Sequence, residues 1–142
     1  MPQELKVNPS GITAANVNLA YGDLGGHKSA QSDVVKAYTQ SLLNTVVETW
    51  VLLPVDLIHR ESSHKKHPCV PLRKALYGHP ESGYHWGARF KEIMVSMGGK
   101  LDNDHQSNYI FKNGLLLTLY DDVLLSGPEH LHALFWTELQ SI

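Results

Sequence analysis

The chain has 142 residues, of which 14 are Asp or Glu and 12 are Lys or Arg, for a formal net charge of −2. This length suits one domain with a single core, and a hydrophobic fraction of 42% suffices to build it. The charge balance excludes a strong electrostatic footprint for nucleic acid, because affinity for phosphate backbones comes largely from Lys and Arg.

Three features of the sequence favour an intracellular protein, in the cytoplasm or nucleus. The single cysteine, Cys69, excludes an internal disulfide and fits a reducing compartment. No apolar stretch is long enough to span a membrane, and Met1 to Lys6 lack the basic and apolar regions of a signal peptide. We therefore expect neither secretion nor a membrane partner.

The first half of the chain predicts little regular structure. Met1 to Gln31 is rich in Gly, Asn, Ser and Ala and contains no motif that we can place, so we expect a loosely ordered segment. Val46 to Leu53 predicts a strand that ends at Pro54, because its β-branched and aromatic residues favour extended backbone. A polar loop, Arg60 to Pro68, follows it.

Histidines and the cysteine in and after this loop raise the possibility of a zinc site. His64, His67 and Cys69 are close enough in sequence to converge, and imidazole and thiolate are good zinc ligands. A structural zinc needs a fourth ligand, which only His79 or His85 could supply. A solvated, histidine-rich loop is therefore the better interpretation.

Two amphipathic helices are predicted in the second half of the chain. The first has one apolar face and ends at Gly98-Gly99, as helices often end at glycine. The second begins at Pro128, a residue favoured at helix starts. We expect both apolar faces to pack on the back of a sheet. Their residues are Trp86, Phe90, Ile93, Met94 and Met97 in the first helix, and Leu131, Leu134, Phe135 and Leu139 in the second.

Between these helices the sequence predicts a three-stranded antiparallel meander. Its strands are Ser107 to Lys112, Leu115 to Tyr120 and Val123 to Ser126. Asn113-Gly114 is a strong hairpin signal because both residues accept positive φ. The pair Asp121-Asp122 forms the second turn, so the predicted fold class is α+β, with the meander packed on the two helices.

Adjacent carboxylates between apolar strands admit two interpretations. Asp is common in turns, so Asp121-Asp122 fits an acidic turn. Alternatively, a divalent cation neutralises the pair, since Mg²⁺ prefers oxygen ligands and is usually held by one or two carboxylates plus substrate phosphates. Successive strand side chains point to opposite faces, so one Asp would bind the cation directly while the other supports it or faces solvent.

Three sequence blocks, in this order, resemble the reverse transcriptase of copia-type LTR retrotransposons, a domain of their Pol polyprotein. The first block starts at Asp33 and has the form Asp-Val-x-x-Ala-aromatic. The second runs from Lys74 to Trp86 and includes Lys-Ala-Leu-Tyr-Gly, and the third is the hairpin around Asp121-Asp122. The resemblance extends from about Ser32 to Gln140. It divides the chain into a poorly defined segment, 1–31, which is either loosely ordered or residual finger sequence, and a partial, palm-like polymerase domain, 32–142.

The resemblance implies RNA-directed DNA synthesis by two-metal nucleotidyl transfer. Asp33 and Asp121 would hold Mg²⁺ or Mn²⁺, with Asp122 as a supporting catalytic acid, and such ions stabilise both the attacking and the leaving oxygen. Arg73 and Lys74, which stay cationic at neutral pH, would meet phosphates, and Tyr120 would border the nucleotide or template. A solvated surface pair is an equal alternative for Arg73 and Lys74. The implied partners are an RNA template, a DNA primer, deoxynucleoside triphosphates and other Pol polyprotein domains.

The chain departs from the family pattern at several positions. The family hairpin reads Tyr-x-Asp-Asp, so either Leu119 replaces the tyrosine or one residue is deleted after Tyr120, which would turn Tyr120 away from the site. Glu81 stands where a glutamine is expected, and Tyr84 where an arginine is expected. The alternative function is therefore a catalytically inactive remnant that keeps the fold as an interaction module.

Overall fold

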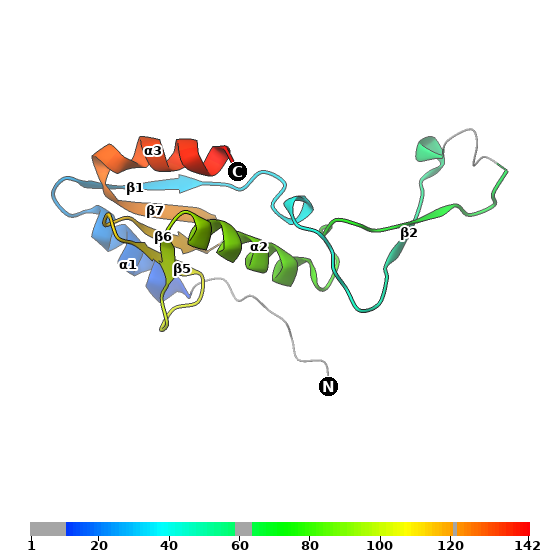
Figure 1. Ribbon diagram of the computed structural model, residues 1–142, viewed down its shortest axis with the longest axis horizontal. Helices are drawn as coiled ribbons and strands as arrows, with labels where there is room; N and C mark the ends of the chain where they lie inside the picture. Colours follow the sequence, from blue (N-terminus) through cyan, green and yellow to red (C-terminus); the bar gives the residue numbers. More distant parts are fainter. Residues whose placement is uncertain (1–10, 59–63, 121) are drawn as a thin grey trace.

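A computed structural model describes residues 11–58, 64–120 and 122–142 and has a mixed α+β architecture (Figure 1). None of its described helices is long and apolar enough to cross a membrane. In chain order its elements are α1 (Ile12–Gly22), β1 (His27–Ser32), η1 (Tyr38–Gln40), β2 (Trp50–Leu52), η2 (Val55–Leu57), β3 (Cys69–Pro71), α2 (Ser82–Ser96), β4 (Gly99–Leu101), β5 (Asn108–Phe111), β6 (Leu116–Leu119), β7 (Val123–Pro128) and α3 (Glu129–Gln140).

The main sheet has five antiparallel strands in the order β1-β7-β6-β5-β4. The predicted meander of β5, β6 and β7 is confirmed. Its first hairpin uses the three-residue loop 112–114. Within this loop, Gly114 N donates a hydrogen bond to Phe111 O at 3.0 Å. Gly114 has φ +90°, whereas Asn113 does not have a positive φ. The turn therefore differs from the two-residue form that Asn-Gly pairs favour.

Alternation along the strands gives the sheet two buried faces. Leu117, Leu119 and Val123 point to one face, where they form the hydrophobic core with Phe90 of α2 and Phe135 of α3. The predicted packing of both helices on the meander is confirmed. Thr118, between two of these leucines, points the other way and bonds to Asn18 of α1, so α1 covers the opposite face.

Both predicted helices form, with adjustments at their ends and faces. The first predicted helix is α2, which begins before Trp86, at Ser82, and ends at Ser96, two residues before Gly98, whose φ is +88°. Gly99 starts β4, a strand that the sequence analysis did not predict. In α3, Leu134 is 68% exposed, so its assignment to the apolar face is wrong, and His132 is buried in that helix instead.

The segment before Asp33 contains more structure than the sequence indicated. Residues 12–22 form α1, and residues 27–32 form β1, which pairs with β7 along its length. For these residues the expected loose order is wrong. Small side chains explain both why α1 packs closely on β1 and why this segment shows no apolar periodicity. Gly22 approaches Ser29 so closely that a Cβ at position 22 would lie 1.9 Å from Ser29 Oγ. Residues 1–10 lie outside the described part.

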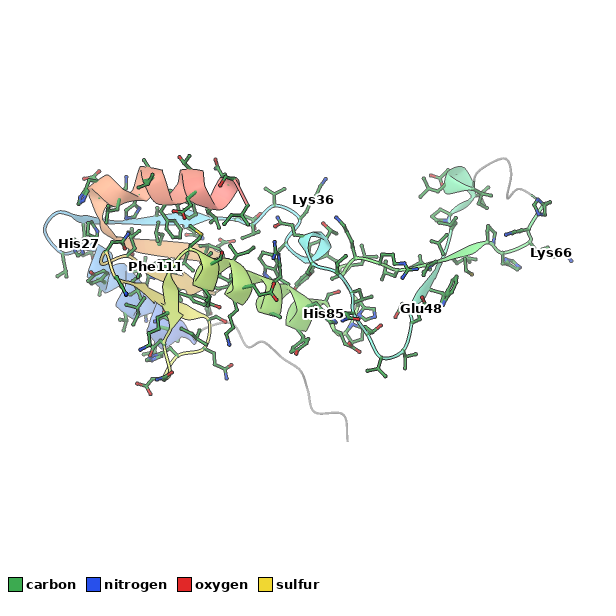
Figure 2. The ribbon with its side chains drawn as sticks, viewed as in Figure 1. His27, Lys36, Glu48, Lys66, His85 and Phe111 are labelled. Carbon is green, nitrogen blue, oxygen red and sulfur yellow. The ribbon has the colours of Figure 1, made fainter. Side chains whose placement is uncertain are left out.

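The predicted strand Val46 to Leu53 is shorter and lies outside the main sheet. Only Trp50–Leu52 forms β2, which pairs with β3 in a separate two-stranded sheet. Val46 is fully exposed and Val47 is 78% exposed, so neither has the packed neighbours that favour a strand. We call residues 44–58 and 64–72 the arm: in Figures 1 and 2 they extend away from the five-stranded sheet, with Lys66 near the far end.

Candidate active site

Strand pairing brings the first acidic block and the acidic hairpin to one end of the sheet. Ser32, the last residue of β1, pairs with Val123, the first residue of β7. Asp33 follows directly after Ser32, and Asp122 directly precedes Val123. Residues some 90 positions apart in sequence therefore leave adjacent strands side by side. Asp121, the predicted metal ligand and catalytic acid, lies outside the described residues.

The hairpin that carries Asp122 is tight. Leu119 pairs with Val123, and Tyr120 N donates a hydrogen bond to Asp122 O at 3.0 Å. Leu119 is 9% exposed and faces the core. Tyr120 borders two cavities, the one that Asp33 lines and the one that Gln31 and Asp122 line, so it lies at the acidic end of the sheet.

The Asp122 carboxylate lies on the α1 side of the sheet. Its Oδ2 accepts a hydrogen bond from Gln31 Nε2 at 2.5 Å, a partner on the neighbouring strand β1. Both residues border a shallow cavity that is also lined by Ile12 and Leu19 of α1. Because Asp33 lines a different cavity, on the α2 side, the two described acids of the candidate site are separated by the sheet edge.

The cavity beside Asp33 has a volume of about 340 Å³, within the range of small-ligand pockets. It joins all three sequence blocks, because the first contributes Asp33 and Tyr38, the second Tyr77 and Trp86, and the third Tyr120. The Tyr38 and Tyr77 rings are in contact, with centroids 4.7 Å apart. The remaining lining residues are Val34, Ala37, Gly83, Gly87 and Leu119.

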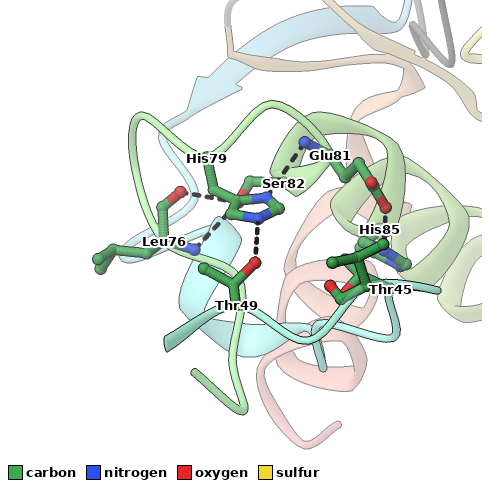
Figure 3. A network of polar contacts seen from close by, with 8 residues as sticks. Thr45, Thr49, Leu76, His79, Glu81, Ser82 and His85 are labelled. Carbon is green, nitrogen blue, oxygen red and sulfur yellow. Dashed lines mark hydrogen bonds and ion pairs between the residues drawn. The ribbon is translucent and has the colours of Figure 1, made fainter. Parts of the chain in front are cut away.

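Polar contacts at the start of α2 fix the second block (Figure 3). Ser82 Oγ is buried, accepts a hydrogen bond from Leu76 N at 3.0 Å and donates one to Leu76 O at 2.7 Å. His79 Nδ1 accepts from Glu81 N at 3.2 Å, which leaves Nε2 protonated to donate to Thr49 Oγ1 at 3.0 Å. These bonds hold the turn that carries Tyr77 against both α2 and the arm.

The predicted phosphate-binding residues Arg73 and Lys74 do not reach this cavity. Both are exposed in the segment after β3, where Lys74 forms an isolated bridge with Leu42. Neither residue lines the cavity beside Asp33. In this conformation they fit the alternative of a solvated surface pair, and only a ligand that extends along the arm would meet them.

Metal-ligand geometry is incomplete in the part of the chain that the structure describes. There, no three His, Cys, Asp or Glu side chains converge on one point. His64, His67 and Cys69 do not form a zinc site with His79, which bonds to Thr49, or with His85, which lies 3.6 Å from Glu81. At the acidic end of the sheet, the exposed Asp33 carboxylate offers the hard oxygen donors that suit Mg²⁺, with Asp121 as the partner implied by the resemblance.

Sequence reasoning missed several residues of the candidate site. Tyr38 and Tyr77 were recognised as motif members without a role, and Trp86 was assigned to the core alone. Gln31 was placed in the loosely ordered segment, and no local signal identified it, because its partner Asp122 lies on a hairpin distant in sequence. Comparisons of the chain with protein-family models, with curated proteins and with solved structures give no match.

Proposed function

We propose that the chain is the palm portion of a copia-type RNA-directed DNA polymerase, with Mg²⁺-dependent nucleotidyl transfer as its chemistry. One observation supports this proposal above the others: three sequence blocks, far apart in the chain, meet at one cavity whose rim carries Asp33. The β1–β7 register adds Asp122 to the same end of the sheet, because Ser32 pairs with Val123. The polymerase palm assignment rests on these positions together with the sequence resemblance.

In this proposal, Asp33 and Asp121 would hold the divalent cations, and the cations would supply charge neutralisation for nucleotidyl transfer. The chain's own contribution is positioning, because phosphoryl transfer depends mainly on geometry and electrostatics. Tyr38 and Tyr77 offer an aromatic wall for the incoming nucleotide, and Leu119 excludes water from the inner side of the cavity. Gln31 orients Asp122 through its hydrogen bond to the carboxylate.

Primer and template contacts require more positive charge than this chain carries. Its 12 Lys and Arg are outnumbered by 14 acids, and Arg73 and Lys74 lie away from the cavity. We therefore propose that other Pol polyprotein domains supply most of the phosphate contacts to the RNA template and DNA primer. Alone, the chain should extend a primer poorly or not at all.

A catalytically inactive remnant that acts as an interaction module is the second candidate. The observation that favours it is the Gln31–Asp122 hydrogen bond, because the amide N–H occupies one oxygen of this carboxylate. A remnant would also tolerate Glu81, whose carboxylate lies 3.6 Å from His85 Nε2 and adds negative charge near the start of α2.

Calorimetric titration with Mn²⁺ separates the two candidates. The polymerase proposal predicts saturable binding that falls at least tenfold in Asp33→Asn and in Asp121→Asn. Asp56→Asn, an exposed acid on the arm, is the matched control and should bind as the parent chain does. Absence of binding, or equal binding by all four proteins, would contradict the metal-dependent proposal and leave the remnant.

A further inference from the structure

The cavity beside Asp33 is an aromatic enclosure with one acidic residue. Four aromatic residues border it, and they come from four separate segments: Tyr38 from η1, Tyr77 from the turn before α2, Trp86 from α2 and Tyr120 from the β6–β7 hairpin. Tyr120 also borders the shallow cavity on the α1 side, so the first three residues are the ones that belong to this cavity alone. Among the described residues that line the cavity, Asp33 is the only charged one. No Lys or Arg among them would pair with a phosphate or carboxylate, so the lining selects against a free anion.

Aromatic faces carry partial negative charge and attract cations, most strongly when the cation is only weakly hydrated. A primary ammonium is compact and strongly hydrated, and needs hydrogen-bond acceptors to replace its lost water. Val34, Ala37 and Leu119 add apolar side chains to the lining, and the side-chain acceptors among the described lining residues are the Asp33 carboxylate and the tyrosine hydroxyls. This lining suits a cation that presents methyl groups instead of N–H donors.

We propose that this cavity binds a methylated ammonium group, as found in choline-like molecules or in a trimethylated lysine side chain. The rings would surround the methyl groups, and Asp33 would supply the opposite charge. This inference goes beyond the proposed function, because it requires neither a divalent cation nor a nucleotide. It assigns a ligand class that a catalytically inactive chain could retain.

The enclosure has a rigid inner side and an accessible outer side. Trp86 is 8% exposed and packs on Phe90, with ring centroids 5.5 Å apart, so it forms a fixed floor. Tyr77 is 61% exposed and is held by its contact with Tyr38, with ring centroids 4.7 Å apart and planes at 60°. Ser82 and His79 brace the turn that carries Tyr77 (Figure 3). A ligand can therefore enter beside Tyr77 without disrupting the core.

The test is an NMR-monitored titration of the full chain with choline and with its neutral isostere 3,3-dimethylbutan-1-ol. The two molecules have nearly the same shape and differ in charge. We expect saturable shifts with choline at the signals of residues 33–38, 77 and 86, and at least tenfold weaker binding of the isostere. Equal binding of both molecules, or no saturable shift with choline, would overturn the proposal.

Variants assign the binding to this cavity. Tyr77→Leu removes an exposed ring and should weaken choline binding about tenfold, whereas Tyr77→Phe keeps the ring and should bind within about twofold of the parent. Tyr84→Leu, which changes a tyrosine of α2 outside the lining, should leave affinity unchanged. Equal weakening by Tyr84→Leu and Tyr77→Leu would contradict the assignment, and the same spectra report whether each variant is folded.

Two further comparisons distinguish a small molecule from a protein side chain as the source of the methylated ammonium group, and distinguish this inference from the polymerase proposal. Tighter binding of a trimethyllysine peptide than of choline and of the unmethylated peptide would identify a protein side chain as the ligand, whereas choline binding without any peptide preference would identify a small molecule. A chain that binds Mn²⁺ and not choline overturns this inference and leaves the polymerase proposal intact. A chain that binds choline without binding Mn²⁺ supports this inference and contradicts the polymerase proposal.

Discussion

Gln31 and Asp122 are joined by a hydrogen bond of 2.5 Å, Nε2 to Oδ2, across the pair of strands β1 and β7. The bond links the residue two positions before Asp33 to the second acid of the hairpin. It fixes the Asp122 carboxylate on the α1 side of the sheet, while Asp33 lines the cavity on the α2 side. At this end of the sheet, Asp122 and Asp33 therefore lie on opposite sides.

Replacing Gln31 tests how added negative charge beside Asp122 affects stability. Gln31→Glu puts a second carboxylate beside Asp122 and should lower stability in EDTA by about 0.5–1 kcal/mol more than Gln31→Ala, which only removes the donor. Mn²⁺ should reverse the extra loss, because a cation can bridge the two carboxylates. Urea unfolding with and without Mn²⁺ measures both effects. Identical urea-unfolding midpoints for the two variants would contradict this prediction, because they would mean that the two carboxylates do not lie close enough to repel each other.

Asn18 should be essential to the packing of α1. It is fully buried, and its Nδ2 lies 2.9 Å from Thr118 Oγ1 and 3.2–3.3 Å from the carbonyl oxygens of Leu116 and Leu124. Asn18→Ala leaves buried acceptors without this donor and should cost about 1–3 kcal/mol in urea unfolding. Asn16→Ala, on the exposed side of α1, is the control. A loss no larger than that of the control would contradict the described contact.

Gly22 should tolerate no side chain. A Cβ there would lie 1.9 Å from Ser29 Oγ and 3.0 Å from Ser126 Oγ, so Gly22→Ala forces α1 away from β1 and should destabilise by about 1–3 kcal/mol. At Gly25 a Cβ would meet nothing within 4 Å, and Gly25→Ala should be close to neutral. Thermal unfolding of both variants measures the difference. A neutral Gly22→Ala would mean that α1 packs at a greater distance.

His132 should make stability depend on pH. Burial lowers the pKa of His132, opposed by its hydrogen bond to Gly127 O and by Glu129, while Lys28 adds to the lowering. A lowered folded-state pKa means that stability is present above the unfolded value of about 6.5 and is lost as pH falls through the folded pKa. His132→Gln should flatten stability between pH 7 and 5. His130→Gln, an exposed neighbour on α3, should keep the slope of the parent chain.

The meander and its two helices could be predicted because their signals are local. Alternating leucines in β6 and the glycines at 98 and 114 mark strands and ends without reference to the rest of the chain. The strand β4 was missed because Gly99, its first residue, had been assigned to a helix stop. His132 was missed because a buried histidine interrupts the apolar pattern that identifies a helix face.

The N-terminal elements and the site could not be predicted from local pattern. The buried residues of α1 are Ala14, Ala15, Asn18 and Gly22, which form a small and polar face with no apolar periodicity. The pairing of β1 with β7 joins segments some 90 residues apart, and no local signal sets its register. Local pattern therefore places neither Asp33 near Asp122 nor the aromatic residues around one cavity, and the resemblance alone linked the acids.

Paramagnetic broadening of NMR signals by Mn²⁺ tests the central claim most directly, because it reports where the cation binds. The polymerase proposal predicts that the amide signals of residues 32–34 and 120–123 broaden together at the lowest Mn²⁺ concentrations, and that Asp33→Asn abolishes the effect. The loop at residues 102–105, where Asp102 binds His105, serves as the internal comparison. Broadening confined to that loop, or to only one of the two segments at the end of the sheet, would contradict a shared cation site formed by Asp33 and the acidic hairpin.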